Sequence, residues 1–404
     1  IGTHICGIIG RDEAVEAVLL AYHTPLYFVW KNKIEPGWVH VVLFGDTTTG
    51  KRIPREIRHG LGLGTYVVME TASRTGLLYS IQYVEKRRPI VVLGEFALAD
   101  KALLIIDGFD KMHKEEKREF SEAYRTGVLK VRRDAKLDAP MRVRLITCEN
   151  VQKPMNHYMY PCSALLDNYT PPDIARIDLA VPFRAEDVPA EKFMRRWEKP
   201  PENLNEIIEA LRLNVTWAWN IPHEKIKFTA EAENLIYEKA REFDSKYGSS
   251  RLPLVSKDMD KKIAKLSIAH AILTRSIDDE DNVIVKKDHV EHVTKLIDRI
   301  YSGEAMRLDQ YVETEKERTC LSDQEFQEIY NELIKAEENK FYPIFNVILR
   351  ELELRGTTQL NELQAVIEDE LGTESSQSTI KRRISILKTC LLYTSDAADD
   401  GESV

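Results

Sequence analysis

The stretch that decides the fold is Gly45-Asp46-Thr47-Thr48-Thr49-Gly50-Lys51-Arg52. It follows an apolar run, Val39 to Phe44, that is typical of a buried strand, and it precedes a polar run compatible with a helix. A strand, a glycine-bounded loop and a lysine at the start of a helix form a phosphate cradle, because backbone N–H groups point at the anion. The usual pattern has Ser or Thr after the lysine to hold Mg²⁺, whereas here Arg52 stands there. The loop alone therefore leaves open whether a nucleotide binds.

A phosphate loop needs a second strand that ends in a carboxylate. The apolar run Ala102 to Ile106 ends in Asp107, which would hold Mg²⁺ through water. The next position should be Glu, to activate the attacking water, but Gly108 has no side chain with which to do so. The two motifs together predict descent from a nucleotide-binding site.

Other apolar runs alternate with helical patterns, which predicts an α/β fold with a mostly parallel, covered sheet. A strand, the basic tip Lys86-Arg87-Arg88 and a second strand predict one hairpin, and a second hairpin begins at 127–131. Helices follow almost without interruption from 203 to 302. His289 and His292 lie one turn apart there, and we expect surface histidines without a carboxylate partner.

The composition of the chain excludes some classes of protein and favours others. The chain has 404 residues, 43% apolar and 30% charged residues, which suits a globular protein of roughly two or three domains. The net charge of −9 means that nucleic-acid binding must come from local basic patches. Five scattered cysteines without a C-x-x-C pattern argue against a zinc ribbon or a disulfide framework and favour a reducing compartment. No run predicts a membrane span or a signal peptide, so we expect a cytoplasmic, nucleoid-associated protein, or a nuclear one in a eukaryote.

Near the C-terminus, three short helices, the third carrying Lys381, Arg382 and Arg383, predict a winged-helix-like module, with a helical protein-contact bundle as the alternative. The absence of an initiator Met leads us to expect a fragment. The predicted boundaries are an α/β nucleotide-binding domain at 1–184, a linker at 185–227, a helical lid at 228–305, a connector at 306–340, the module at 341–389 and a non-native tail at 390–404.

The run from Gly94 to Met112 resembles the signature stretch of the minichromosome maintenance (MCM) helicases, a branch of the AAA+ ATPases. In that family an Ala-Asp pair, here Ala99-Asp100, leads into the strand, and Asp-Glu-Phe-Asp-Lys-Met closes it, here Asp107 to Met112. Ile5-Cys6-Gly7 resembles the family's Ile-Tyr-Gly entry to the domain. The resemblance implies a P-loop AAA+ three-layer α-β-α domain with a helical lid, and it covers residues 1–300 well.

The resemblance also implies roles for single residues. Lys51 matches the phosphate-binding lysine, Asp107 the metal-holding aspartate, and Asn150 the polar residue that senses the attacking water. Ala175-Arg176-Ile177-Asp178-Leu179 resembles Ser-Arg-Phe-Asp-Leu, so Arg176 matches the arginine finger that reaches a neighbour's nucleotide. Such a site is complete only in a homo-oligomer, which the family implies is a hexameric ring, with ATP and Mg²⁺ as cofactors.

Lys130 matches the lysine of the hairpin that projects into the ring channel, and three cations lie near it. The resemblance therefore implies contact with single-stranded DNA and, in replication, with duplex DNA; a solvated basic turn is the alternative. The cations near Lys130 are Arg132, Arg133 and Lys136.

Three departures from the family pattern bear on function. Arg52 replaces the Mg²⁺-binding hydroxyl, Gly108 replaces the catalytic Glu, and the lid has no clear second sensor arginine, with Lys257 the nearest cation. The first hypothesis is an ATP-dependent DNA helicase motor acting in replication. The alternatives are a catalytically degenerate AAA+ DNA-binding or regulatory subunit, and a DNA-binding initiator led by the C-terminal module.

Overall fold

The computed structural model describes residues 2, 4–84, 88–132, 135–185, 199–319, 364 and 366–368. The chain divides into two compact units, Ile1–Val312 and Glu313–Val404, and nearly all described residues belong to the first. The predicted winged-helix-like module lies outside the described residues, apart from 364 and 366–368, and so does the predicted tail.

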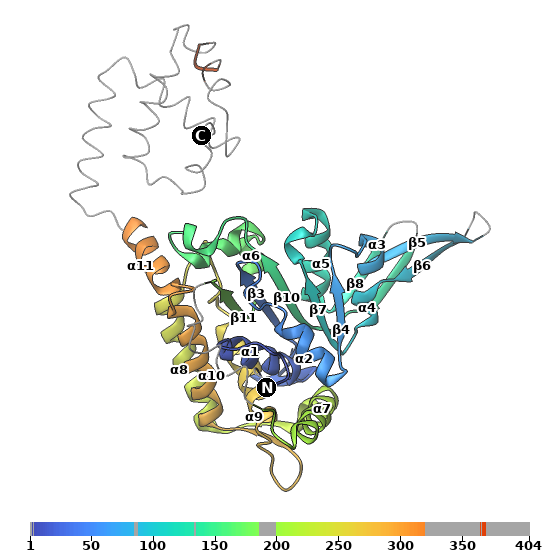
Figure 1. The fold of residues 1–404 in the computed structure, drawn as a ribbon, viewed down its shortest axis with the longest axis vertical. Helices are drawn as coiled ribbons and strands as arrows, with labels where there is room; N and C mark the ends of the chain where they lie inside the picture. The colour runs from blue at the N-terminus through green and yellow to red at the C-terminus, as the bar shows by residue number, and fades with distance from the viewer. Residues whose placement is uncertain are drawn as a thin grey trace. The chain divides into compact units, whose positions relative to one another are not determined.

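Five parallel strands form the central sheet of the first unit, in the order β11-β3-β10-β7-β4 (Figure 1). Nearly all side chains of the three central strands are buried, which is why β3 and β7 are mostly apolar, whereas β10 also buries Arg144, Thr147 and Glu149. This confirms the predicted parallel sheet. The bounds are His40–Gly45 for β3, Thr65–Val68 for β4, Leu103–Asp107 for β7, Arg144–Asn150 for β10 and Leu179–Phe183 for β11.

Helices flank this sheet, as the α/β class requires. Helix α1 (Asp12–Tyr22) packs against β3, β10 and β11, and α2 (Ile53–Leu61) follows the phosphate loop. Helix α5 (Lys114–Thr126) reaches the sheet through Tyr124, whose ring meets that of His40 edge-on at 5.7 Å. Shorter helical segments are α3 (Arg74–Leu77), α4 (Glu95–Leu98), α6 (Pro171–Ile174), η1 (Phe109–Lys111), η2 (Met155–His157), η3 (Pro161–Asp167) and η5 (His223–Lys225).

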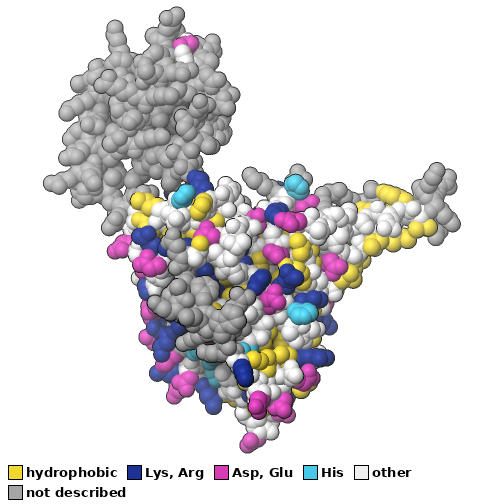
Figure 2. Space-filling view, viewed as in Figure 1, with side chains coloured by type: hydrophobic (Ala, Val, Ile, Leu, Met, Phe, Trp, Pro, Cys, Tyr) yellow, Lys and Arg dark blue, Asp and Glu magenta, His cyan; other side chains and the backbone are white. Residues whose placement is uncertain are grey.

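Two antiparallel hairpins leave the sheet. The hairpin of β5 (Tyr79–Val84) and β6 (Arg88–Leu93) extends away from the body of the unit (Figure 1). Apolar side chains line it in Figure 2, and Tyr83, Val84, Ile90 and Val92 are exposed. The other hairpin pairs β8 (Val128–Arg132) with β9 (Lys136–Pro140). Both hairpins were predicted, whereas the short pair β1 (Tyr27–Trp30) and β2 (Lys33–Pro36) was not.

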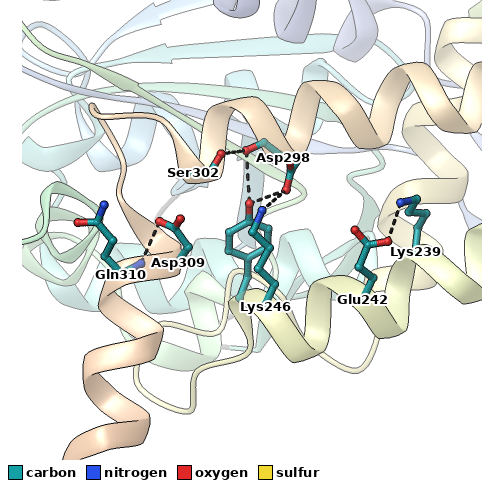
Figure 3. Close-up of polar contacts among 8 residues, drawn as sticks. Lys239, Glu242, Lys246, Asp298, Ser302, Asp309 and Gln310 are labelled. Carbon is teal, nitrogen blue, oxygen red and sulfur yellow. Dashed lines mark hydrogen bonds and ion pairs between the residues drawn. The ribbon is translucent and has the colours of Figure 1, made fainter.

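Three long helices form the bundle that the sequence predicted as a lid: α8 (Ala230–Tyr247), α9 (Met259–Leu273) and α10 (Lys287–Ser302). Asp298 of α10 ties two of them together, because its carboxylate accepts from Lys246 of α8 at 2.8 Å (Figure 3). Helix α9 also packs against α1, which joins the bundle to the sheet layer. A parallel pair, β12 (Ile226–Phe228) and β13 (Val283–Val285), lies beside the bundle, and α11 (Leu308–Thr319) follows it.

The stretch predicted as a linker contains a docked helix, α7 (Leu204–Asn220). The Trp219 indole donates to the Tyr22 carbonyl at 2.8 Å and stacks on the Tyr22 ring. The buried guanidinium of Arg144 lies 5.2 Å from the Trp219 ring. An aromatic side chain at the end of α7 therefore anchors this helix to α1 and β10.

The expectation of surface histidines without a carboxylate partner holds only for the exposure of His292 and is otherwise wrong. His289 is buried, with 8% exposure, and accepts a hydrogen bond from the Lys286 N–H at 2.9 Å. His292 stacks on His270 with ring centroids 4.1 Å apart and contacts the carboxylate of Glu16 on α1. The local sequence carried no sign of that carboxylate, because Glu16 lies 276 residues earlier in the chain.

Candidate functional site

The phosphate loop begins where β3 ends, at Gly45. This residue pairs with Phe183 of β11 and has φ of 139°, and a Cβ there would lie 2.1 Å from the Phe183 carbonyl oxygen. Only glycine therefore permits the strand to turn into the loop. Thr48 and Gly50 also have positive φ, 61° and 101°. Backbone that turns in this way presents consecutive N–H groups to an anion.

A pocket of about 740 Å³ lies over this loop. It gathers groups from three neighbouring strands, because the carboxyl ends of parallel strands meet at one edge of the sheet. Of the residues predicted for the site, those on its wall are Thr47, Thr48, Thr49, Gly50, Lys51, Arg52, Asp107 and Asn150. Gly7, Ile8, Ile9, Arg11 and Ala185 complete the wall. Within the described residues, Lys257 does not line it.

Lys51 is the cation at the base of the pocket. Its ammonium donates to the Gly45 carbonyl at 2.8 Å and to the Asp46 carbonyl. Burial lowers the pKa of Lys51 to about 8, so most of the side chain stays protonated at neutral pH. A positive charge held among loop carbonyls is suited to binding phosphate oxygens.

Asp46 has a structural task that the sequence did not reveal. One carboxylate oxygen accepts from the Met155 N–H at 2.8 Å, and the other accepts from the Ala185 N–H at 3.0 Å. These N–H groups belong to the segments that follow β10 and β11. Asp46 lines a second pocket of about 360 Å³ on that side of the loop. Its carboxylate therefore ties the loop to two neighbouring segments.

Asp107 and Asn150 lie at the ends of β7 and β10, on the wall of the larger pocket. The Asp107 carboxylate accepts from the Tyr66 hydroxyl at 2.5 Å. The Asn150 main chain is held on both sides, with its N–H donating to Asp110 at 3.1 Å and its carbonyl accepting from Asn168 at 3.2 Å. Local sequence patterns did not identify Tyr66, Asp110 or Asn168 as partners.

The residues present do not complete a magnesium site. Mg²⁺ in phosphate sites needs oxygen ligands, such as a loop hydroxyl and a carboxylate. Arg52 supplies a cation where that hydroxyl would be, and Asp107 is the one carboxylate on the described pocket wall. No group of three or more His, Cys, Asp and Glu side chains in the described residues is arranged to hold a metal.

Arg176 lies outside the pocket, at the end of α6. Its guanidinium donates to the Asp173 carboxylate at 2.8 Å and to the Ser121 hydroxyl at 2.5 Å, and the side chain is 32% exposed. Ser121 belongs to α5, whose Lys117 donates at 3.2 Å to the carbonyl of Asn168. Arg176 therefore does not line the pocket of its own chain, and its assignment as an arginine finger stays a prediction.

The β8–β9 hairpin presents one charged face. Lys130 lies opposite Asp138, and Arg132 lies opposite Lys136, so all four side chains point to the same side of the ribbon. All four are exposed, and Arg132 forms an ion pair with Asp138. The face carries three cations and one anion. Arg133 lies outside the described residues.

A parallel sheet with a glycine-bounded loop after one strand and a terminal aspartate on another defines a P-loop nucleotide-binding domain. Residues 3–152 match the family model of the MCM P-loop domain. The match covers 150 of the 404 residues and supports an MCM-family AAA+ motor region in this part of the chain. A search of curated proteins returned no match. Within the described part of the chain, no helix combines the length and the apolar character needed to cross a bilayer.

Proposed function

We propose that the chain is an ATP-binding subunit of an MCM-type DNA motor. The observation that carries this proposal is the single pocket that brings Lys51, Asp107 and Asn150 together over the phosphate loop. The MCM P-loop match over residues 3–152 supports the same reading. The proposed substrate is ATP, because the loop and Lys51 bind phosphates and motors of this class act on ATP.

In the proposed reaction, Lys51 neutralises charge on the terminal phosphates and the Asn150 amide orients the attacking water. Arg176 of one subunit stabilises charge in the pocket of the next, which makes the active unit a ring, proposed to be a hexamer. The charged face of the β8–β9 hairpin contacts the phosphates of single-stranded DNA, without reading bases. Hydrolysis would move this hairpin and draw the strand through the ring.

A second candidate is a subunit that binds nucleotide without hydrolysing it. Gly108 favours this candidate, because no carboxylate stands next to Asp107 to polarise water. Arg52 favours it as well, since it removes a hydroxyl ligand for the metal. Loss of one such group costs about 3 kcal/mol of transition-state stabilisation, so two losses leave little turnover.

The test is to restore both groups. We expect weak or no DNA-stimulated ATPase activity in the chain as it stands and at least a hundredfold increase (~3 kcal/mol) in the double variant Arg52→Ser, Gly108→Glu. The new Glu has room, because the nearest atoms to a Cβ at 108 lie 3.6 and 3.8 Å away. Its φ of 80° adds strain of about 1–2 kcal/mol, so the variant's thermal stability is measured in parallel.

Two controls separate the candidates. Lys51→Ala in the repaired chain should abolish turnover and weaken nucleotide binding. Arg176→Ala should abolish turnover while nucleotide binding survives, since the arginine acts in the next subunit's pocket. Robust turnover by the unrepaired chain would contradict the degenerate-site argument, and a folded, repaired chain that stays inactive would contradict the motor proposal.

A further inference from the structure

We propose that this pocket binds the nucleoside triphosphate as a metal-free polyanion, with the Arg52 guanidinium on its phosphates in the place of Mg²⁺. The inference rests on the proposed nucleotide site and concerns the ionic form of its ligand. The pocket residues do not complete a site for Mg²⁺, and we infer that they fit the triphosphate without the metal instead.

The first observation is the placement of Arg52. It is the residue immediately before α2, with φ of −72° and ψ of −1°, and its exposed side chain lines the pocket beside Lys51. Its carbonyl accepts from the Glu56 N–H at 3.1 Å, but within the described part of the chain the Arg52 side chain has no hydrogen-bond or ion-pair partner. Its guanidinium is therefore available to a ligand. Arginine is well suited to phosphate, because its planar fork of N–H donors matches two oxygens at once.

The second observation is the charge of the side chains that line the pocket; the carboxylates of Asp46 and Asp110 also act on Lys51 but do not line it. Three cations line it, Lys51, Arg52 and Arg11, against one carboxylate, Asp107. The Arg11 guanidinium is fixed, since it donates to the Arg184 carbonyl at 2.6 Å and lies 4.8 Å from the centre of the Phe183 ring. Such a surplus of positive charge favours the fully anionic triphosphate. Mg²⁺ removes part of that negative charge and repels a neighbouring guanidinium.

The third observation is the state of the protein's own metal ligands. The loop hydroxyl is replaced by Arg52, and the Asp107 carboxylate already accepts a hydrogen bond from the Tyr66 hydroxyl. Mg²⁺ would therefore have one protein ligand fewer, and its other ligand, Asp107, is already bonded to Tyr66. The phosphates, by contrast, gain Arg52 as an additional cation. These changes all shift preference away from the Mg²⁺ complex.

The experiment measures the affinity of the full chain for a fluorescent ATP analogue, once with excess EDTA and once with excess Mg²⁺. We expect the affinity in EDTA to equal or exceed the affinity in Mg²⁺. Arg52→Ser should weaken binding in EDTA about ten- to hundredfold, the effect of losing one charge-assisted hydrogen bond, and should make binding stronger with Mg²⁺. Arg52→Lys keeps the positive charge, so the affinity of this variant for the ATP analogue should stay independent of Mg²⁺.

Arg55→Ser is the matched control, because Arg55 is an exposed arginine on α2 that does not line the pocket; it should leave both affinities unchanged. Binding that requires Mg²⁺ would overturn this inference and leave the nucleotide-binding proposal standing. Binding in neither condition, by a chain whose circular dichroism shows it folded, would overturn both. An Arg52→Ser affinity equal to that of the unchanged chain in EDTA would show that the guanidinium does not contact the ligand.

Discussion

Gly45 and Gly108 both have positive φ, 139° and 80°, and both lie at the carboxyl edge of the sheet. At Gly45 the neighbouring strand leaves no room for a Cβ, so the residue is required by packing. At Gly108 the space is open, and the main consequence of the glycine is the missing carboxylate. At the scale of single residues, Gly45 therefore allows the phosphate loop to form, and Gly108 limits the chemistry of the site.

The packing argument makes a prediction for Gly45→Ala. A methyl group 2.1 Å from the Phe183 carbonyl would force β3 and β11 apart, and we expect a loss of unfolding free energy of about 3 kcal/mol or more. Gly62→Ala is the control, since Gly62 also has positive φ, 66°, but nothing lies within 4 Å of the added Cβ. Its loss should be only about 1 kcal/mol. Chemical denaturation measures both, and equal losses would refute the steric explanation.

At the scale of elements, the β8–β9 hairpin carries the proposed DNA contact. We expect Lys130→Ala with Arg132→Ala to weaken binding of single-stranded DNA and to reduce the slope of log affinity against log salt by about 1.4, or about 0.7 per lost phosphate contact. Each residue is exposed on the same face, so the substitutions leave the buried side of the hairpin unchanged. Fluorescence anisotropy at several salt concentrations provides the measurement.

A control for the hairpin comes from α10. Lys287→Ala with Lys295→Ala removes two exposed cations from that helix, both of them paired with Glu291, and therefore changes net charge by the same amount. The α10 variant should retain the original salt slope. If both double variants lose affinity equally, overall charge and not the hairpin governs DNA binding.

At the scale of the whole molecule, histidines that are buried (His23, His40) or half-buried (His270) couple stability to pH. Burial lowers the pKa of His23, His40 and His270 to about 4, from 6.5. The unfolded chain therefore binds more protons than the folded chain between about pH 6.5 and pH 4, and stability falls as the pH falls through this window. Glu149 has the opposite effect on stability, because burial raises the pKa of its carboxyl group from 4.5 to about 7. Its contribution to the free energy of unfolding is therefore lost as the pH rises between these two values.

Burial also lowers the pKa of His289, so four histidines oppose one glutamate, and the net expectation is a loss of stability on acidification. Each of the other three histidines contributes on the order of 1–3 kcal/mol. We expect the thermal unfolding midpoint to fall clearly between pH 7 and pH 5, and His23→Gln to reduce that fall by removing one titrating group. His59→Gln, at an exposed position of α2, should leave the fall unchanged. An unfolding midpoint that rises on acidification would show that Glu149 dominates.

Much of the fold could be predicted because its signals are local. Buried parallel strands are rich in apolar residues, and the predicted runs Val39 to Phe44 and Ala102 to Ile106 match β3 and β7 to within one residue at each end. Three-residue strands such as β12 and β13 carry too short a pattern, and they pair across more than fifty residues. The docking of α7 depends on Trp219 meeting Tyr22 and Arg144, which lie in other parts of the sequence.

The sequence by itself determined the class of this domain and its two chemical departures. Glycine spacing, an apolar strand and its terminal aspartate are neighbours along the chain, so Arg52 and Gly108 could be identified as unusual without a structure. Only the tertiary structure decided which charges share a pocket and which partners occupy them. Tyr66 on Asp107 and Glu16 beside His292 are examples, the latter pair being 276 residues apart. Contacts between distant segments depend on how helices and strands pack, and local patterns do not record that packing.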